Sequence, residues 1–346
     1  MAPHPRSVLS ASLSAKLDAL HRSSGRRKSD RELAEILADL STLPANAVVR
    51  ASQEIAKAAR LGWWQQERSL IDQLLGGSVS EPDLLARNPD YAWLFLFHPS
   101  GYVREAALDS INSPPTSPFF VSALAWRLND WAAPVRQAAE RCAKRILHRT
   151  AAPVATNAAL YLLDRRLAWG RWRDEPKALD AVFERKDVIA ALVMHLQEHS
   201  TGALATCLRH ALRYPNIDEH LPRLAAEAVQ PQIRAVAYQC LIFGRARWAV
   251  GYEFAWIDKV YGLRRSVPTL ETRQIASIRP TADLIREAAY DKSPFVRRVA
   301  ADALIADQTQ LPDAAALIAH LAKDRNSAIR SRADFMLRNP PSTPST

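Results

Sequence analysis

The feature that most constrains the fold of this chain is a short pattern that recurs along it. In each copy a polar turn leads to Val or Ile, then Arg, then small residues at helical spacing, then an apolar residue. The repeated arginines are separated by 32, 98, 63 and 33 residues, close to one, three, two and one units of about 32 residues, a period typical of solenoids. This spacing predicts degenerate units near residues 168, 202 and 265. The five arginines are Arg104, Arg136, Arg234, Arg297 and Arg330.

The fourth copy, DKSPFVRRVAADAL from Asp291, shows why the pattern predicts a helix. Ser and Pro suit the first turn, where a side-chain oxygen caps a free amide and proline fits the backbone. Val296, Ala300 and Leu304 then fall on one face at helical spacing. Because a single helix cannot bury such a stripe, each must pair with the preceding helix and stack on the next repeat. The sequence therefore predicts an all-α protein.

The composition of the chain argues against several classes of protein. Glycine is scarce, at 10 of 346 residues, and neither GxGxxG nor GxxxxGK[ST] occurs, which disfavours nucleotide-binding α/β folds. No stretch approaches the roughly 18 apolar residues of a membrane span. Three scattered cysteines form no CxxC pair, and the first residues lack the apolar segment of a secretory signal. We therefore expect a cytoplasmic protein with no membrane partner and no cofactor.

The pattern D-x-x-x-x-V-R-x-x-A-x-x-x-L resembles the HEAT family, specifically the short bacterial HEAT-like repeats also found in phycobilin lyases. The resemblance covers roughly residues 40 to 340 and implies a right-handed α-solenoid, an α-α superhelix of helix pairs. It implies that the second helix of each pair lines a concave face. It also implies that the repeated arginine pairs with an aspartate of the turn, in a ladder between neighbours. Since the family spans scaffolds, lyases, hydroxylases and DNA glycosylases, the resemblance implies an architecture rather than an activity.

The repeat pattern divides the chain into three parts. Residues 1–28 are predicted to form an N-terminal arm or cap, and residues 29–338 the solenoid. Poor matches to the pattern indicate degenerate units near 151–229 and 244–280. The tail, residues 339–346, reads NPPSTPST and is predicted to be disordered.

Two clusters of tryptophan and arginine lie where the repeat is degraded, and local departures from a structural rule often mark function. Arginine holds phosphates and flat rings stack on bases, so this mixture suits a nucleic-acid surface. The alternative is structural, with each tryptophan filling a gap between repeats and arginines stacked over it. The first cluster contains Arg165, Arg166, Trp169, Arg171, Trp172 and Arg173. The second contains Arg245, Arg247, Trp248, Tyr252, Trp256, Lys259, Tyr261, Arg264 and Arg265.

A few residues are candidates for chemistry. His195 and His199 stand one helical turn apart in an H-x-x-E-H pattern, a spacing that suits two metal ligands. The sequence supplies no third ligand for them, so no metal site is predicted. The chain also resembles the helical-repeat DNA glycosylases, which are HEAT-like, basic and rich in Trp and use an Asp in an aromatic cleft. Asp174 is the matching candidate, although their paired-Trp-Asp signature is absent, since the Trp pair at 63–64 is followed by Gln.

Charge and architecture together define the functional hypotheses. A formal charge of +10 suits an acidic partner, either nucleic acid or an acidic protein. The leading prediction is a non-enzymatic scaffold that binds an acidic protein on a concave face centred on residues 130–265. The alternative is a protein that binds DNA or RNA through the two clusters, with repair of the glycosylase type as its enzymatic extreme. A lyase-like or metal-dependent enzyme is the third hypothesis, and the identity of the partner does not follow from the sequence.

Overall fold

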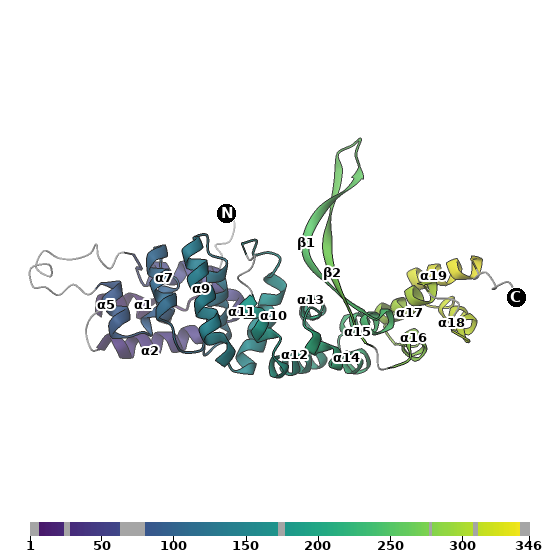
Figure 1. Cartoon of the computed structure of the whole chain (residues 1–346), viewed down its shortest axis with the longest axis horizontal. Coiled ribbons are helices and arrows are strands. Elements are labelled where there is room, and N and C mark those ends of the chain that lie inside the picture. Colours follow the sequence, from purple (N-terminus) through teal and green to yellow (C-terminus); the bar gives the residue numbers. More distant parts are fainter. Residues whose placement is uncertain are drawn as a thin grey trace, which may run out of the picture. The chain divides into compact units, whose positions relative to one another are not determined.

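The chain forms two compact units, Met1–Val188 and Ile189–Thr346. Both are built mainly from helices that pack against one another in pairs, in agreement with the repeat pattern. Within the described residues the second unit also contains a long β-hairpin (Figure 1). The computed structural model describes residues 7–23, 28–62, 80–171, 177–276, 279–306 and 311–339.

In the first unit, α7 packs on α9, and α8 packs on both α9 and α10. The buried side chains are mostly leucine, alanine and phenylalanine, and the small alanines allow neighbouring helices to approach closely. The elements are α1 (Ala11–Ser23), α2 (Lys28–Ser41), η1 (Ala45–Ala47), α3 (Val48–Ala58), α5 (Glu81–Arg87), α6 (Tyr91–Phe95), α7 (Gly101–Ser110), α8 (Pro118–Leu128), α9 (Ala133–Ile146), η2 (Leu147–Arg149), α10 (Ala152–Arg165) and α11 (Lys177–Phe183).

In the second unit, α15 packs on α14 and on α17, and α17 packs on α16 and α19. The helical face predicted from the fourth copy is buried in α17, where Val296, Ala300 and Leu304 are inaccessible to solvent. Helix α12 (Lys186–Glu198) begins at the end of the first unit and continues into the second. The remaining elements are α13 (Leu204–Ala211), η3 (Pro215–His220), α14 (Leu221–Glu227), α15 (Pro231–Phe243), β1 (Arg245–Asp258), β2 (Leu263–Gln274), α16 (Thr281–Ala289), α17 (Pro294–Ala306), α18 (Ala314–Leu321) and α19 (Ser327–Arg338).

Three of the five repeated arginines pair with an aspartate of the following turn, as the HEAT resemblance implies. The other two, Arg136 and Arg330, donate to carbonyl oxygens of the turn before their own helix. Arg297 donates to both oxygens of Asp324 in the next turn, and its Nη1 donates to the carbonyl oxygen of Asp291 at 2.8 Å. Arg234 does the same one repeat earlier, with Asp291 at 3.0 and 2.8 Å. Arg104 forms the corresponding pair with Asp130 in the first unit, at 3.0 Å for both contacts. Bidentate pairs of this kind fix the spacing between successive helix pairs.

The prediction of a degenerate helical unit near residue 265 is wrong, because this segment forms a β-hairpin. The prediction of a wholly helical fold is wrong for the same reason. The Arg234–Asp291 pair spans 57 residues, whereas the Arg297–Asp324 pair spans 27. The segment from Arg245 to Gln274, which forms the hairpin β1–β2, accounts for the extra length of the first pair. The interval between Arg234 and Arg297 is therefore one repeat plus an insertion, and the chain resumes its helical packing on the far side of it.

Other expectations have simpler outcomes. The predicted helix near residue 202 is present as α13, and Cys142, Cys207 and Cys240 are buried and form no disulfide among the described residues. No helix in the described part of the chain is long and apolar enough to cross a bilayer. Helix α1, within the predicted N-terminal arm or cap, packs on α2 and α3. The predicted disorder of the tail concerns residues outside those that the structure describes, apart from Asn339.

Candidate nucleic-acid interface

The hairpin arm, residues Arg245–Gln274, is a two-stranded antiparallel ribbon that leaves the helices between α15 and α16 (Figure 1). Its strands are rich in aromatic and β-branched residues, which favour extended backbone. The register pairs Arg245 with Gln274 at the root and Trp256 with Arg264 near the tip. Irregularities in the register between Ala249 and Gly251 and again after Trp256 interrupt the pairing at two points.

One side of the arm carries a row of exposed rings. Side chains alternate between the two faces of a strand, so Tyr252, Phe254 and Trp256 share one face. They are 64%, 72% and 50% exposed. Across the ribbon, the guanidinium of Arg264 lies 4.8 Å from the centroid of the Trp256 ring and 5.8 Å from that of Phe254. These four residues form the aromatic face, a solvent-exposed surface of three rings and one positive charge.

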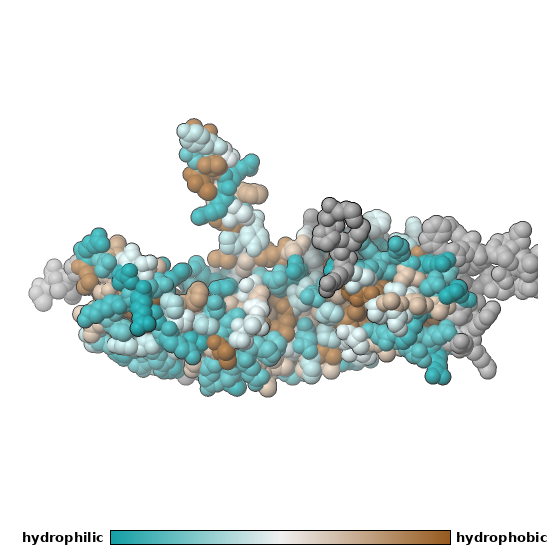
Figure 2. All heavy atoms as spheres, turned by 180° about the vertical axis from the view of Figure 1, so that it is seen from behind, coloured by the Kyte–Doolittle hydropathy of each residue, from teal (hydrophilic) through white to brown (hydrophobic). Residues whose placement is uncertain are grey.

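The tip and the opposite face of the arm add apolar and basic groups. Figure 2 shows hydrophobic residues distributed along the projecting arm between hydrophilic ones. Val260 and Tyr261 are almost fully exposed, and their amides donate to the side chain of Asp258. Gly262 has a φ of +66°, a left-handed conformation that lets the chain turn back into β2. Arg265 lies opposite Ala255, on the face away from the rings.

The root of the arm is fastened to the helices of the second unit. Arg273 donates to both oxygens of Asp218 at 2.6 Å and to the carbonyl oxygen of Leu212 at 2.9 Å. The amide of Ile275 donates to the carbonyl of Gly244 at 2.8 Å, which closes the ribbon at its base. An isolated hairpin is marginally stable in water, so these contacts give the arm a fixed point of attachment.

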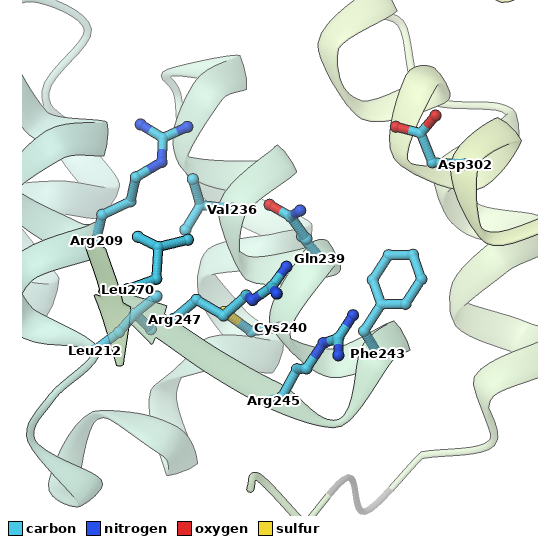
Figure 3. A pocket seen from close by; sticks show the side chains of 10 residues that line it. All are labelled: Arg209, Leu212, Val236, Gln239, Cys240, Phe243, Arg245, Arg247, Leu270 and Asp302. Carbon is cyan, nitrogen blue, oxygen red and sulfur yellow. The ribbon is translucent and has the colours of Figure 1, made fainter. Parts of the chain in front are cut away.

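A pocket of about 390 Å³ lies at this root (Figure 3). Arg209, Arg245 and Arg247 line it, and none of their side chains makes a hydrogen bond or ion pair with another described residue. The lining carboxylate, Asp302, is paired with Arg332 and lies 3.8 Å from Arg298. The arginines of the pocket therefore keep their positive charge available for an anion.

The floor of this root pocket is apolar. Leu212, Val236, Phe243 and Leu270 line it beside the buried Cys240. Burial raises the pKa of the Cys240 thiol to about 12, so the sulfur is neutral and unreactive at physiological pH. The pocket thus combines an uncharged floor with cationic walls, which suits a phosphate attached to a less polar group.

The first cluster of tryptophan and arginine, residues 165–173, differs from the arm in the burial of its tryptophan at position 169. Trp169 is buried and packs edge-on against Trp126 and Tyr161, with centroids 5.2 and 6.2 Å apart. The burial of Trp169 agrees with the structural alternative, but Arg166 pairs with both carboxylate oxygens of Asp180 rather than stacking over the tryptophan. Arg165 lies over the ring of Tyr161 at 5.6 Å, and Arg171 is exposed. Trp172, Arg173 and the catalytic candidate Asp174 lie outside the described residues.

The two candidate metal ligands stack on each other instead of facing a shared site. The rings of His195 and His199 have centroids 3.8 Å apart, and Nδ1 of His199 lies 3.0 Å from the carbonyl oxygen of His195. Burial, and then the neighbouring His199, lower the pKa of His195. No group of three metal-ligating side chains occurs in the described ranges, so the arrangement offers no third ligand for these histidines.

Sequence reasoning singled out most of the residues of this candidate interface but missed two, Phe254 and Arg209. Phe254 completes the aromatic face, and the period-two alternation of Tyr252, Phe254 and Trp256 was the signal for it. Arg209 comes from α13, far from the arm in sequence, and no local pattern could bring it to the root pocket. Trp248 donates from Nε1 to Glu271 at 3.1 Å and so belongs to the ribbon itself.

Comparison with known proteins adds no assignment: no family model, curated protein or solved structure matches this chain.

Proposed function

We propose that this protein is a HEAT-like helical-repeat protein that binds nucleic acid through the hairpin arm. The paired helices and the arginine–aspartate contacts between repeats support the solenoid part of this proposal. The observation that carries the binding function is the aromatic face, where three exposed rings share one side of the arm. The guanidinium of Arg264 lies over two of these rings and pairs with no carboxylate of the described residues. We expect this binding to occur in the cytoplasm.

The chemistry of the arm suits the two parts of a nucleotide. Aromatic side chains stack on bases, and each such contact contributes about 1–3 kcal/mol to binding. Arginines neutralise phosphates and release condensed counterions, which makes affinity fall steeply with salt. Because the rings of Tyr252, Phe254 and Trp256 are accessible from one side, unpaired bases fit them better than the interior of a duplex. We therefore propose single-stranded DNA or RNA as the preferred ligand.

The root pocket extends this surface. Arg209, Arg245 and Arg247 would hold backbone phosphates of a strand whose bases lie along the arm. An acidic protein, the leading prediction from the sequence, would also satisfy these arginines, but it would leave the rings of the aromatic face without a flat partner. The rings are therefore what favours nucleic acid over an acidic protein as the partner.

The test is fluorescence anisotropy of labelled single-stranded DNA, single-stranded RNA and duplex DNA, each titrated with protein between about 50 and 200 mM salt. We expect micromolar or tighter binding to the single strands, with weaker binding to duplex. The double variant Trp256→Ala/Arg264→Ala is expected to lose at least about tenfold in affinity.

The matched control is Arg223→Ala, which removes an exposed arginine of α14 that pairs with Glu227. It should leave affinity unchanged within about twofold, since it lies off the arm. Absence of binding to every probe at low salt, or equal binding by the double variant and the wild type, would contradict the proposal.

A further inference from the structure

A second pocket, of about 380 Å³, lies in the first unit, separate from the arm. Residues of α3, of the turn before α7 and of the end of α8 line it. Its polar lining is concentrated around the turn that begins at Asn129. The residues that matter for its chemistry are Arg104, Trp126, Arg127, Asp130, Trp131 and Arg171.

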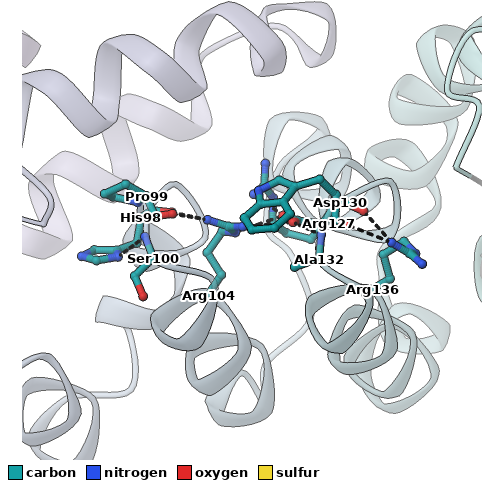
Figure 4. A network of polar contacts seen from close by, with 9 residues as sticks. His98, Pro99, Ser100, Arg104, Arg127, Asp130, Ala132 and Arg136 are labelled. Atoms are coloured by element: carbon teal, nitrogen blue, oxygen red, sulfur yellow. Dashed lines mark hydrogen bonds and ion pairs between the residues drawn. The ribbon is translucent and has the colours of Figure 1, made fainter.

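Asp130 is the centre of the network at this pocket (Figure 4). Its carboxylate accepts two hydrogen bonds from Arg104 at 3.0 Å, one from Arg127 at 2.7 Å and one from the amide of Ala132 at 3.1 Å. Its side chain is 1% exposed. Two arginines thus share one buried carboxylate.

The equivalent aspartates of the second unit each pair with one arginine. Asp291 pairs with Arg234 and Asp324 pairs with Arg297, and neither carboxylate has a second arginine partner among the described residues. Arg104 is the counterpart of those two arginines in the first unit. Arg127 is therefore additional to the contact that joins the repeats, and the repeat architecture does not require it.

The additional arginine brings an uncompensated charge into the protein. Arg127 is 7% exposed, and its Nε has no hydrogen-bond partner. Burial lowers the pKa of Arg127 to about 10, which leaves the guanidinium positive at physiological pH. Asp130 is the one carboxylate among the described residues that line the pocket, and it also serves Arg104.

Neighbouring groups do not remove this excess. The carbonyl end of α8 offers Arg127 at most about half a negative charge. His98 adds none, since burial lowers the pKa of its imidazole and keeps it neutral at pH 7. A buried cation without a counter-charge is costly, so a protein that retains one usually pairs it with an anion.

We propose that this pocket binds a small molecule that carries an oxyanion on a flat ring. The oxyanion would accept from the free Nε of Arg127 and from Arg171, which is exposed and whose side chain makes no hydrogen bond or ion pair with a described residue. The ring would lie against Trp131, which is 72% exposed, or Trp126, whose ring centroid is 5.8 Å from the Arg127 guanidinium. A bare phosphate would leave most of this volume unfilled, and pockets of this size take whole small molecules.

The pocket shares no residue with the arm, so the proposal does not rest on the nucleic-acid function. Isothermal titration calorimetry on the full chain tests it with three probes: inorganic phosphate, adenosine monophosphate and benzoate. We expect binding of one of the ring compounds that is at least about tenfold tighter than that of inorganic phosphate, and the better ring compound identifies the oxyanion as phosphate or carboxylate.

The decisive variant is Arg127→Met, which removes the charge and keeps most of the volume. It should weaken binding of the better probe at least about tenfold and leave the melting temperature unchanged or raised, because the second of two buried cations that share one carboxylate has been removed. Arg141→Ala, which removes a half-exposed arginine paired with Asp109, is the control and should not change probe binding. Binding of no ring probe, or equal binding by Arg127→Met, would overturn the proposal.

Trp131→Ala provides a second test that does not depend on the buried network, since this side chain is exposed. It should weaken binding of the ring compound several-fold and leave binding of inorganic phosphate unchanged. Unchanged binding of the ring compound by this variant and by Trp126→Leu, which removes the flat ring, would also overturn the proposed position of the ring. Single-stranded DNA binding by Arg127→Met should equal that of the wild type, which separates this site from the arm.

Discussion

Two segments of this protein share the same mixture of tryptophan and arginine, but the tryptophan of one is buried and that of the other is half exposed. In the segment after α10, Trp169 is buried against two other rings and Arg166 is paired with Asp180. In the hairpin arm, Trp256 is half exposed and Arg264 lies over its ring without a carboxylate partner among the described residues. The residue types are the same, and the backbone decides the outcome: a turn between packed helices buries its rings, whereas a two-stranded ribbon has no layer to cover it.

The largest expected effect concerns the buried member of this comparison. Trp169→Ala should lower the free energy of unfolding by about 3–5 kcal/mol, because it leaves a cavity between Trp126 and Tyr161. Urea denaturation followed by circular dichroism measures it. Nucleic-acid affinity, measured well below the melting temperature, should not change. A loss of stability below about 1 kcal/mol would show that the ring is not part of the core.

Trp256→Ala should have the opposite effect: it should weaken nucleic-acid binding and leave stability almost unchanged. Affinity for single-stranded DNA should fall about tenfold, since one stacking contact contributes about 1–3 kcal/mol. Stability should change by less than about 0.5 kcal/mol, because the ring is half exposed. Trp256→Phe keeps a flat ring and should recover most of the affinity. An alanine variant that binds normally but unfolds early would place Trp256 with Trp169 as a structural residue.

Substitution of one arginine in each segment should have smaller effects than substitution of the tryptophans. Arg166→Ala should reduce stability by about 1 kcal/mol, since its bidentate pair with Asp180 is partly buried. Arg264→Ala should leave stability unchanged and reduce the slope of log affinity against log salt by about one. Anisotropy titrations at several salt concentrations measure the slope. Equal salt slopes for Arg264→Ala and the wild type would mean that this guanidinium meets no phosphate.

The root pocket gives the smallest single effects. Arg209→Ala and Arg247→Ala should each weaken single-strand binding by a few-fold, through the loss of one phosphate contact. Because neither side chain pairs with a described carboxylate, melting temperatures should stay within about 2 °C of the wild type. Thermal melting and anisotropy on the same samples check both statements. A marked fall in melting temperature would mean that these arginines stabilise the root instead.

The helical part of the fold could be predicted because each repeat carries its own signal. The Val-Arg pair and the small residues after it predicted the helices, and the HEAT resemblance implied the pairing of Arg297 with Asp324. Local sequence is sufficient for such helices, because the spacing of their apolar residues lies within each copy of the pattern. The network around Asp130 follows the same rule as far as Arg104, and only the additional Arg127 departs from it.

The hairpin arm could not be predicted from the repeat period. The interval from Arg234 to Arg297 is nearly twice the repeat length, so its size alone does not distinguish an inserted hairpin from a degenerate unit. Alternating residues from Trp248 to Trp256, followed by a turn with Gly262, were the signal for a ribbon. Nor could the sequence separate Trp169 from Trp256, because burial depends on which elements pack around each ring.

The most direct test of the account is a variant with a shortened arm. Replacing Val250–Thr269 with Asn-Gly joins the paired residues Ala249 and Leu270 through a two-residue turn that suits a hairpin. The root pocket and the contact of Arg273 with Asp218 stay in place.

Anisotropy measures how tightly this variant binds single-stranded DNA, and thermal melting of the same sample checks that the helices remain folded. The account predicts about a 100-fold loss of affinity with an unchanged helical melting transition, since the rings and the distal arginines are removed together. Wild-type affinity in the shortened variant would contradict the account and move any nucleic-acid site off the arm.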